Sequence, residues 1–490
     1  MSELLLGIDI GTSACKVAVF RPDGAVMAQA SEGYELYYPQ PGWAEQHPEE
    51  WWSAICKAVQ RVLADDQICA SDICGIGIDG QSWSAIPVDQ DGECLCRTPI
   101  WMDTRASDIC KRVNEEVGAE AIFSVAGNSF EPSYTTPKMI WFREERPDIY
   151  ERAAVFLQSN SYIAYRLTGR FSQDVSQGYG LHFFNMRTCT YDGGLAKALG
   201  LSVDKVPEPV ACHTVIGTVT KGAAAVTGLL EGTPVVAGGL DAACGTLGAG
   251  VYRPGQTQEQ GGQAGGMSIC IDEAVGHPKL ILGTHVVPDL WLLQGGTVGG
   301  GGVLRWFKRE LAQTGESFDD LTAMAAGIAP GSDGVLFLPY MSGERSPIWD
   351  PDAKACFYGL SFDKTRAHMV RAALEGVAFS LEHNLRTAAE AGVHAEDLVA
   401  VGGAANSVLW TQIKADVTGR RIFVPSSDTA ATLGAAILAG VGVGIYADFD
   451  QAVQRTIRMT RVQEPDENAH ICYERAMEQY LKLSRMLSGL

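Results

Sequence analysis

Leu6-Gly7-Ile8-Asp9-Ile10-Gly11-Thr12-Ser13 is the stretch on which the fold of this chain depends. It begins as a short apolar strand and ends with one aspartate beside glycines, which leave the backbone N–H groups accessible. A turn of the same plan occurs in the second half, at Ala237-Gly238-Gly239-Leu240-Asp241-Ala242-Ala243-Cys244-Gly245. A carboxylate next to exposed peptide N–H groups suits magnesium and phosphate chemistry, because the amides bind phosphate oxygens and the carboxylate takes a metal or a proton. The repeat predicts two related lobes that close on one nucleotide.

The residues after the first turn exclude two common phosphate-binding motifs. Lys16-Val17-Ala18-Val19-Phe20 and then Arg21-Pro22-Asp23-Gly24 predict a second strand and a reverse turn, whereas a dinucleotide fingerprint or a P-loop needs a helix there. No Gly-Lys dipeptide occurs in the chain, so a Walker A loop is excluded. What remains is a β-hairpin whose turn wraps a phosphate, as in the actin-like ATPase superfamily. A plain hairpin with an Asp-Gly bend is the alternative.

Composition limits what these turns can belong to. The 490 residues exceed a single core and predict two domains. The 46% hydrophobic and 20% charged residues are typical of a soluble globular protein, and the formal net charge of −20 leaves no broad basic surface for nucleic acid or an anionic membrane. The N-terminus lacks a basic leader, and no apolar stretch is long enough to span a bilayer. We therefore expect a cytoplasmic protein without a nucleic-acid or membrane partner.

The cysteines and histidines show no metal-binding pattern. Thirteen cysteines are scattered from Cys15 to Cys472 without a pair of Cys-x-x-Cys motifs, and the nine histidines are similarly dispersed. Such a set predicts reduced thiols and no structural metal.

Helices and strands are expected to alternate along the chain. Pro48-Glu49-Glu50 predicts the start of a helix, because apolar residues follow it at helical spacing as far as Val62. A similar stripe from Tyr473 to Leu487 predicts a C-terminal helix, and short apolar runs at 73–78 and 334–338 predict buried strands. This alternation indicates an α/β fold.

Two further stretches carry a specific resemblance. Ser133-Tyr134-Thr135-Thr136-Pro137-Lys138-Met139-Ile140-Trp141-Phe142-Arg143-Glu144-Glu145 resembles the first signature of the FGGY carbohydrate kinases. Ala355-Cys356-Phe357-Tyr358-Gly359-Leu360, with His368-Met369 and Ala372-Ala373-Leu374-Glu375 after it, resembles the second. Both signatures occur in the expected order and at the expected separation, so the resemblance covers nearly the whole chain.

The resemblance implies a domain organisation. Gly343-Glu344-Arg345-Ser346-Pro347 and Leu304-Arg305-Trp306-Phe307 are similar to stretches of the xylulokinase branch. The family fold consists of two actin-like (ribonuclease H-like) ATPase domains around a central cleft. Residues 1–236 are then expected to form the N-terminal domain, which binds the sugar and carries the first phosphate turn. Residues 237–490 are expected to carry the catalytic aspartate, the adenosine loop and the C-terminal helix.

The resemblance also implies roles for the two aspartates. Asp241 matches the catalytic base, which accepts the proton of the sugar hydroxyl as that oxygen attacks the γ-phosphorus, while alignment and charge stabilisation supply most of the rate. Asp9 matches the aspartate that holds magnesium. Lys16 matches a position that is often basic, and both a phosphate contact and a solvated surface lysine stay open for it. The first phosphate turn is Gly11, Thr12 and Ser13.

The other end of the nucleotide is expected on Gly402-Gly403-Ala404-Ala405-Asn406-Ser407. The family uses this loop to let adenine and ribose lie against the backbone, which a side chain would obstruct. A second phosphate turn, commonly Gly-Thr-Ser-Gly, is Gly262-Gln263-Ala264-Gly265 here and has no hydroxyl. ATP and Mg²⁺ are the implied cofactors. The expected nucleotide contacts outside the first turn are Gly262, Gly265, Gly402, Gly403, Ala404 and Asn406.

Sugar recognition in this family comes mainly from the first domain. The matching positions are the loop Gly80-Gln81-Ser82-Trp83-Ser84 and the run Ile100-Trp101-Met102-Asp103-Thr104-Arg105. Tryptophan provides a flat apolar face for a sugar, and Asp and Arg provide hydrogen bonds to hydroxyls. The alternative is that Trp101 packs in the core and that the two charged residues form a surface pair. The expected sugar contacts are Gln81, Ser82, Trp83, Trp101, Asp103, Arg105 and Asp241.

The chain departs from the family pattern at several positions. Xylulokinases usually have Gln-Met-His-Gly where Gln81-Ser82-Trp83-Ser84 stands, so an indole replaces an imidazole. Ala242 follows the catalytic aspartate where many relatives have Asn, and Gln263 occupies the second phosphate turn. Thr429 stands where relatives often have Glu, a change with no functional interpretation. These departures leave the acceptor sugar open.

The resemblance predicts an ATP-dependent sugar kinase acting on a ketopentose, with D-xylulose and its 5-phosphate as the first candidate pair. Trp83 and Ala242 motivate a second hypothesis, in which the acceptor is another ketose, a polyol or a signalling sugar. The hypothesis from a different class is a non-catalytic sugar sensor, against which the retention of both Asp9 and Asp241 speaks. A small-molecule sugar is the expected partner. The sequence leaves the oligomeric state open, a homodimer included.

Overall fold

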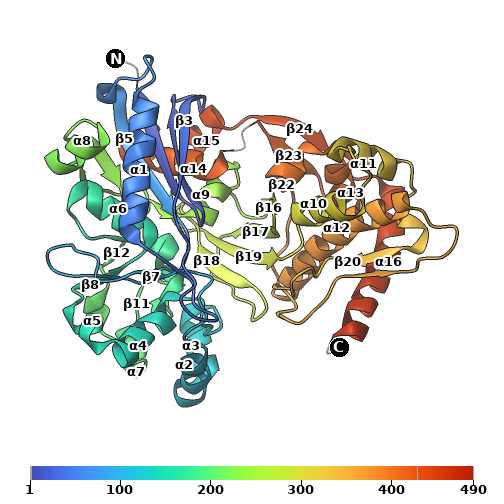
Figure 1. Ribbon diagram of the computed structural model, residues 1–490, viewed down its shortest axis with the longest axis horizontal. Helices are drawn as coiled ribbons and strands as arrows, with labels where there is room; N and C mark the ends of the chain where they lie inside the picture. Colours follow the sequence, from blue (N-terminus) through green and yellow to red (C-terminus); the bar gives the residue numbers. More distant parts are fainter. Residues whose placement is uncertain (1–2, 427–428, 489–490) are drawn as a thin grey trace.

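The computed structural model describes residues 3–426 and 429–488, and two lobes lie side by side in it (Figure 1). The left lobe is drawn mostly in the blue and green of the first half, and the right lobe in the yellow to red of the second half. Within the described ranges, each lobe is built on a seven-stranded mixed sheet. The α/β fold with two actin-like domains is confirmed.

The first sheet has the strand order β13-β14-β5-β1-β2-β3, and β15 pairs with the end of β5. β1, β2 and β3 are antiparallel neighbours, whereas β5 is parallel to β1 and β14 is parallel to β5. The β1–β2 hairpin confirms the second strand predicted after the first turn. The strands are β1 Leu4–Ile10, β2 Ala14–Phe20, β3 Val26–Gly33, β5 Ile73–Gly80, β13 Val215–Thr218, β14 Pro234–Val236 and β15 Gly239–Leu240.

The second sheet repeats this plan in the order β18-β19-β17-β16-β22-β23-β24. β16, β17 and β19 are antiparallel neighbours, and β22 and β23 continue parallel to β16. The strands are β16 Thr257–Gly261, β17 Gly265–Ile271, β18 Ile281–Thr284, β19 Trp291–Thr297, β22 Leu398–Val401, β23 Ile422–Pro425 and β24 Met459–Gln463.

The topology corrects the repeat that the sequence suggested. The structural counterpart of the Gly11–Ser13 turn, which joins β1 to β2, is the turn at 262–264, which joins β16 to β17. The Asp241 turn instead follows β15 and belongs to the edge of the first sheet. The two aspartate turns look alike because each follows a buried strand next to glycine, but they are not equivalent positions of a duplicated lobe.

Helices cover both faces of the first sheet. α1 (Pro48–Leu63), α6 (Ser159–Thr168) and α8 (Lys221–Thr227) lie on one face, and the residues predicted to line the inner side of α1 are buried. α9 (Asp241–Gly248) and α14 (Ala430–Gly442) lie on the other face. α14 approaches the strands so closely that a Cβ at Gly7 would lie 2.0 Å from the carbonyl oxygen of Thr432. Only glycine permits this contact.

Some elements from the second half of the chain lie in the first lobe. α14 and α15 (Phe449–Thr456) come late in the sequence, yet α14 packs on β1 and β5 and α15 packs on α14, at the top of the left lobe in Figure 1. The linear division expected between residues 236 and 237 therefore does not describe the lobes fully, because part of the second half completes the first lobe.

The right lobe packs around a long central helix, α12 (Arg366–Glu390), with α13 (Val408–Thr418) and the C-terminal helix α16 (Glu467–Leu487) beside it. α16 confirms the predicted C-terminal helix, since Tyr473, Met477 and Tyr480 are buried on its inner face. α10 (Gly301–Leu311), α11 (Phe318–Ala326) and a ribbon of β20 (Leu336–Leu338) with β21 (Cys356–Tyr358) complete the lobe. β20 is shorter than the predicted run 334–338, because a 3-10 turn occupies Ser332–Gly334.

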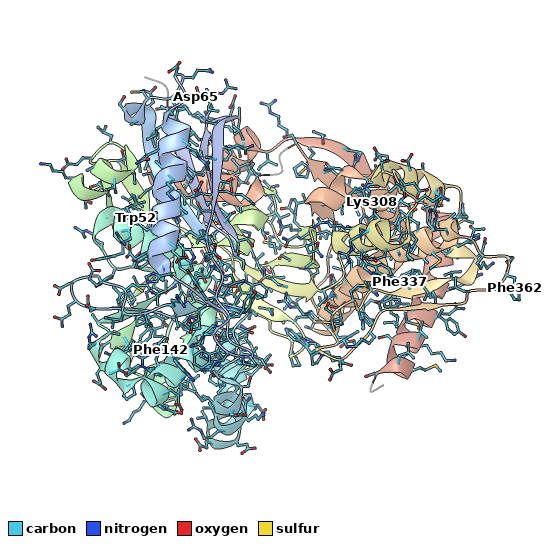
Figure 2. The ribbon with its side chains drawn as sticks, in the orientation of Figure 1. Trp52, Asp65, Phe142, Lys308, Phe337 and Phe362 are labelled. Carbon is cyan, nitrogen blue, oxygen red and sulfur yellow. The ribbon has the colours of Figure 1, made fainter. Side chains whose placement is uncertain are left out.

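In the described part of the chain three apolar clusters form the core, and Figure 2 labels one member of each: Trp52 on α1, Phe142 in the lower left lobe and Phe337 in the right lobe. The lower left lobe contains the elements that surround the expected sugar site. They are β4 Glu45–Gln46, β6 Ile86–Val88, β7 Thr98–Pro99, β8 Val155–Leu157, α2 Ser107–Val113, α3 Ala119–Ala126, α4 Thr135–Glu145, α5 Pro147–Arg152 and the 3-10 segment η3 Val175–Gly180. In residues 3–426 and 429–488, no helix combines the length and apolarity that crossing a bilayer requires.

Candidate active site

Three aspartates meet where strands of the first sheet end. Asp9 on β1 and Asp79 on β5 are register partners, and Asp79 is also the partner of Gly239 on β15. Asp241 follows β15 directly and begins α9. Because parallel strands deliver their carboxyl ends to the same edge of a sheet, residues far apart in the sequence become neighbours there.

A cavity of about 870 Å³ opens beside these strand ends. One wall comes from β1, β2 and α9, and the opposite wall from β16 and the residues after β22. The predicted site residues that line it are Asp9, Gly11, Lys16, Asp241, Gly262 and Gly402. The residues expected to hold the metal, to bind phosphate and to act as the base thus line the same cavity.

Asp241 is the most exposed of the three carboxyl groups. It is half-buried, and its Oδ1 accepts a hydrogen bond from the N–H of Ala242 at 2.6 Å. Burial, and then the charge of Asp9, raise the pKa of Asp241 to about 7. A carboxylate with a pKa near neutrality, open to a cavity, has the properties of a general base. Ala242 contributes only its backbone.

Asp9 is nearly buried and has a cation beside it. Burial raises the pKa of Asp9, and the ammonium group of Lys16, 3.8 Å from Oδ2, opposes that rise. The side chain of Lys16 is 67% exposed, and Lys16 also lines the cavity. Both alternatives considered for it, a solvated surface lysine and a phosphate contact, therefore stay open. Its contact with phosphate stays a prediction.

Asp79 is the member of this group that sequence reasoning missed. Its side chain is fully buried, and neither carboxyl oxygen accepts a hydrogen bond from a described residue. Burial, and then the charges of Asp9 and Asp241, raise the pKa of Asp79 well above the usual range. A signal was present, because Gly77-Ile78-Asp79-Gly80 repeats the pattern of Gly7-Ile8-Asp9.

Both phosphate turns present free backbone donors. The N–H groups of Thr12 and Ser13 donate to no other described residue, and the same holds for those of Gly262, Gln263 and Ala264. The carbonyls of Gly262 and Gln263 are used instead, since they accept the N–H groups of Gly301 and Gly302 at the start of α10. Loss of the usual hydroxyls therefore leaves an anion-binding backbone intact in the second turn.

The adenosine loop approaches the second phosphate turn from the side. Gly402 has a φ of 84°, and a Cβ there would lie 3.0 Å from the carbonyl oxygen of Gly261. Gly403 faces open space, so its missing side chain has no structural cause within the protein. Ala404 is buried and Asn406 is exposed, and neither they nor Gly265 line the cavity.

The expected sugar loop packs in a cluster of the rings of Trp83, Tyr134 and Tyr179, which we call the aromatic pocket. Trp83 is buried in the left-handed region, with a φ of 62°, which costs a residue of this size backbone strain. Its ring stacks on Tyr134 at 4.1 Å between centroids, and Tyr179 of η3 packs edge-on at 5.6 Å. Burial, then Tyr134 and then the charge of Asp241 raise the pKa of Tyr179, and η3 adjoins β15 through a 2.8 Å hydrogen bond from the N–H of Leu240 to Oγ of Ser176. The pocket therefore lies next to the base, although its two tyrosines were not among the predicted residues.

Gln81 and Trp101 connect this pocket to the first phosphate turn. The side-chain amide of Gln81 donates to Gln46 at 2.7 Å, and Gln46 donates to the carbonyl of Thr12 at 2.7 Å. The indole N–H of Trp101 donates to the hydroxyl of Thr12 at 3.0 Å. Acceptor and phosphate segments are thus held in one hydrogen-bond network, and Ser82 lies half-buried beside Tyr179.

Asp103 and Arg105 bond to each other, and a sugar contact by either residue stays a prediction. Both oxygens of Asp103 are occupied by Arg105 and by the N–H of Ala44, and Arg105 also pairs with Glu45 at 2.7 Å. The guanidinium lies over the ring of Trp43, at 3.7 Å. The alternative of a surface pair is wrong, because both side chains are buried. Asp103 and Arg105 therefore join residues 44–45 to residues 103–105 by hydrogen bonds.

Arg345 reaches the aromatic pocket from the right lobe. Its guanidinium makes no hydrogen bond or ion pair with any residue in the described part of the chain, although the residue is half-buried. It lies over Gly296, with Cζ 3.2 Å from the position of a Cβ there. Its charge lowers the pKa of both Tyr134 and Tyr179, against the larger effect of their burial. An arginine whose guanidinium has no partner among the described residues is therefore near enough to both tyrosines for its charge to act on them.

Comparison with known proteins matches both halves of the chain. Models of the FGGY family of carbohydrate kinases match at residues 4–248 for the N-terminal domain and at 276–443 for the C-terminal domain. A xylulose kinase of Bacillus subtilis (strain 168) is 32% identical over 459 residues, 93% of this chain and 91% of its own. A gluconokinase of the same organism is 30% identical over 504 residues, 100% of this chain and 97% of its own. The crystal structure of xylulose kinase from Rhodospirillum rubrum matches with a TM-score of 0.92 at 30% identity, over 99% of both chains.

Proposed function

Because this chain belongs to the FGGY family of carbohydrate kinases, we propose that it transfers the γ-phosphoryl group of ATP to a hydroxyl of a ketopentose, with D-xylulose as the first candidate. The proposal takes its acceptor from the xylulose kinases among the relatives. ATP is the phosphoryl donor of the family. The acceptor is the part of the proposal that needs a direct test.

One observation supports the proposal: Asp241 stands on the wall of the cavity that Gly11 of the first phosphate turn and Gly262 of the second also line. In this role Asp241 accepts the proton of the acceptor hydroxyl while the oxygen of that hydroxyl forms a bond to the γ-phosphorus, and the bond from this phosphorus to the β,γ-bridging oxygen of ATP breaks. ADP leaves with the bridging oxygen. Alignment of the two reactants supplies most of the rate, and the base supplies a smaller part.

The residues at the strand ends fit a magnesium ion. Asp9 offers a nearly buried carboxylate beside the phosphate turn, and both oxygens of Asp79 lack a donor among the described residues. Oxygen-only ligands of this kind suit Mg²⁺. We infer that Asp9 holds the ion, directly or through water, with Asp79 behind it. Bound Mg²⁺ would neutralise charge on the β- and γ-phosphates.

A second candidate acceptor is favoured by Arg345. A polyhydroxy acid such as gluconate carries a carboxylate that a guanidinium binds well, and a gluconokinase is among the relatives. Tyr179 is near both Asp241 and Arg345, so an extended acceptor with its reactive hydroxyl at Asp241 would place its other end toward Arg345.

The test is ADP release, coupled to a spectrophotometric signal, with ATP, Mg²⁺ and a panel of acceptors. The panel contains D-xylulose, other ketopentoses and ketohexoses, gluconate, glycerol and tetritols. Turnover with D-xylulose and weaker turnover with the rest is the expected result. Preference for gluconate would overturn the ketopentose assignment. If no acceptor in the panel caused ADP release, while added sugar still shifted the melting temperature, the result would favour a sugar sensor.

A further inference from the structure

Lys138 of the first signature is a buried lysine without a carboxylate partner. It lies in α4 with 0% of its surface exposed, and all of its hydrogen bonds go to backbone carbonyls. Nζ donates to the carbonyls of Trp83 at 2.8 Å, Ile100 at 2.7 Å and Ser133 at 2.5 Å. An ammonium group has three protons, so no donor is left for a ligand.

The three carbonyls belong to three separate segments that build the acceptor pocket. Trp83 supplies one ring of the pocket, and Ile100 directly precedes Trp101, which bonds to the phosphate turn. Ser133 directly precedes Tyr134, which stacks on Trp83. The side chain of Lys138 therefore joins three segments. The segments at Trp83 and Ser133 are 50 positions apart in the sequence, and Lys138 itself is 55 positions from Trp83.

The bond to Trp83 matters most, because that residue is strained. A tryptophan with positive φ persists only where its surroundings determine its conformation strongly. The carbonyl of Trp83 is fixed by the lysine, while its indole N–H is buried without a partner among the described residues. Without the ammonium group, the carbonyl of Trp83 would lose its donor, and ring stacking and the hydrogen bond from Thr135 to the carbonyl of Ser84 would remain to hold this loop.

We propose that Lys138 is a positioning residue, which fixes the three acceptor-pocket segments relative to one another and thereby sets the affinity for the acceptor without touching it. The inference rests on the proposed function for the identity of the pocket as an acceptor site. It assigns to the signature lysine a role in substrate affinity, separate from the chemistry at Asp241.

The charge state of Lys138 allows a second test of the proposal. A neutral amine has two protons and can serve only two of the three carbonyls. Burial lowers the pKa of Lys138 to about 7; the charged groups that face it are Asp103, which acts to raise the pKa, and Arg105, which acts to lower it. The third hydrogen bond is therefore expected to weaken as the pH rises above neutrality.

The first experiment needs no ligand. Hydrogen–deuterium exchange is compared between the wild type, Lys138→Met and the matched control Lys205→Met, whose Nζ donates to the carbonyls of Tyr150 and Ala153 in the same lobe, away from the pocket. Faster exchange confined to residues 81–85, 100–105 and 130–136 is expected in Lys138→Met alone. Unchanged exchange in these segments, or an equal change in both variants, would overturn the proposal.

The second experiment measures D-xylulose. Lys138→Met should raise the KM for D-xylulose about tenfold or more, the range expected for lost hydrogen bonds to a charged group, with kcat and the KM for ATP changed less than threefold. A fall in kcat with an unchanged KM would contradict the proposal. If Lys138→Met does not fold, the Kd of D-xylulose is measured in Asp241→Asn, which removes the titration of the base. That Kd should rise between pH 6.5 and 9, and a constant value would overturn the inference. Absence of D-xylulose binding would instead reject the proposed acceptor, while the exchange experiment still decides the role of Lys138.

Discussion

Asp9 and Asp79 are register partners on the parallel strands β1 and β5, so two carboxyl groups lie against each other at the edge of the first sheet. Such a pair is unstable unless a proton or a cation is shared between them. The unpaired oxygens of Asp79 and the position of Asp9 on the cavity both fit a cation.

Asp79→Asn is expected to weaken the use of Mg²⁺. Removing a carboxylate that supports a metal ligand typically costs roughly tenfold in metal affinity, so the Mg²⁺ concentration for half-maximal ADP release should rise by about that factor. Direct Mn²⁺ binding, followed by electron paramagnetic resonance, checks the effect without turnover. Asp66→Asn, an exposed carboxyl on the far end of the same lobe, is the control. Equal metal affinity in both variants would argue against a role for Asp79.

Asp241→Asn is expected to separate binding from chemistry. The variant keeps the size of the side chain but cannot accept the proton of the acceptor, so kcat should fall by at least ~10²-fold. Binding of ATP and sugar, measured by calorimetry, should stay within a few-fold of the wild type. Turnover at the wild-type rate would show that another group acts as the base.

The Asp241 carboxyl group is expected to make both kcat/KM and the Tm depend on pH. Because burial and Asp9 raise the pKa of Asp241 to about 7, the ionised base is scarce below that pH, and kcat/KM should rise as the pH passes through about 7. The folded state binds this proton more tightly than the unfolded chain, whose pKa is near 3.8, so the stability contributed by the group is complete below pH 3.8 and is lost as the pH rises through about 7. Asp241→Asn should therefore have a higher Tm than the wild type at pH 8, and this advantage should disappear near pH 4. A Tm difference independent of pH would contradict the assignment.

Gly402 and Gly403 test the adenosine loop with a matched pair. Gly403→Ala adds a methyl group into open space, so it should leave the Tm nearly unchanged and raise the KM for ATP only if the nucleotide lies there, by about tenfold. Gly402→Ala places a side chain at positive φ, 3.0 Å from a carbonyl oxygen, and should lower the Tm as well. An unchanged KM for ATP in Gly403→Ala would move the nucleotide away from this loop.

Arg345→Gln tests whether the right lobe contacts the acceptor. Loss of the unpaired guanidinium should raise the KM for the acceptor about tenfold, because a charged hydrogen bond is lost, and should leave the KM for ATP unchanged. Arg309→Gln, on the exposed face of α10, is the control. A larger loss for gluconate than for D-xylulose would indicate that the arginine binds a carboxylate. Equal acceptor KM values in wild type and Arg345→Gln would exclude the contact.

Local patterns made several features predictable. The strand that ends at Asp9, the hairpin after it, α1 and α16 were all expected, because burial on one helical face and alternation in a short strand depend on neighbouring residues alone. The resemblance to the family also predicted the phosphate turns and Asp241, since each lies in a continuous stretch of sequence. The sequence could not show that Asp103 and Arg105 consume each other's hydrogen bonds, because their partners Ala44 and Glu45 lie about 60 positions away.

The sequence by itself determined the strand-ending aspartates, the bare glycine turns and the two-lobed α/β class. Only the tertiary structure decided that Asp241 belongs to the edge of the first sheet, that Asp79 joins Asp9 there, and that α14 from the second half completes the first lobe. It also placed the ammonium group of Lys138 on the carbonyl of Trp83 and the charge of Arg345 near Tyr134. The physical reason is that local propensities fix elements, whereas electrostatics and hydrogen bonding act between atoms that chain crossings bring together, and those distances are not encoded in sequence spacing.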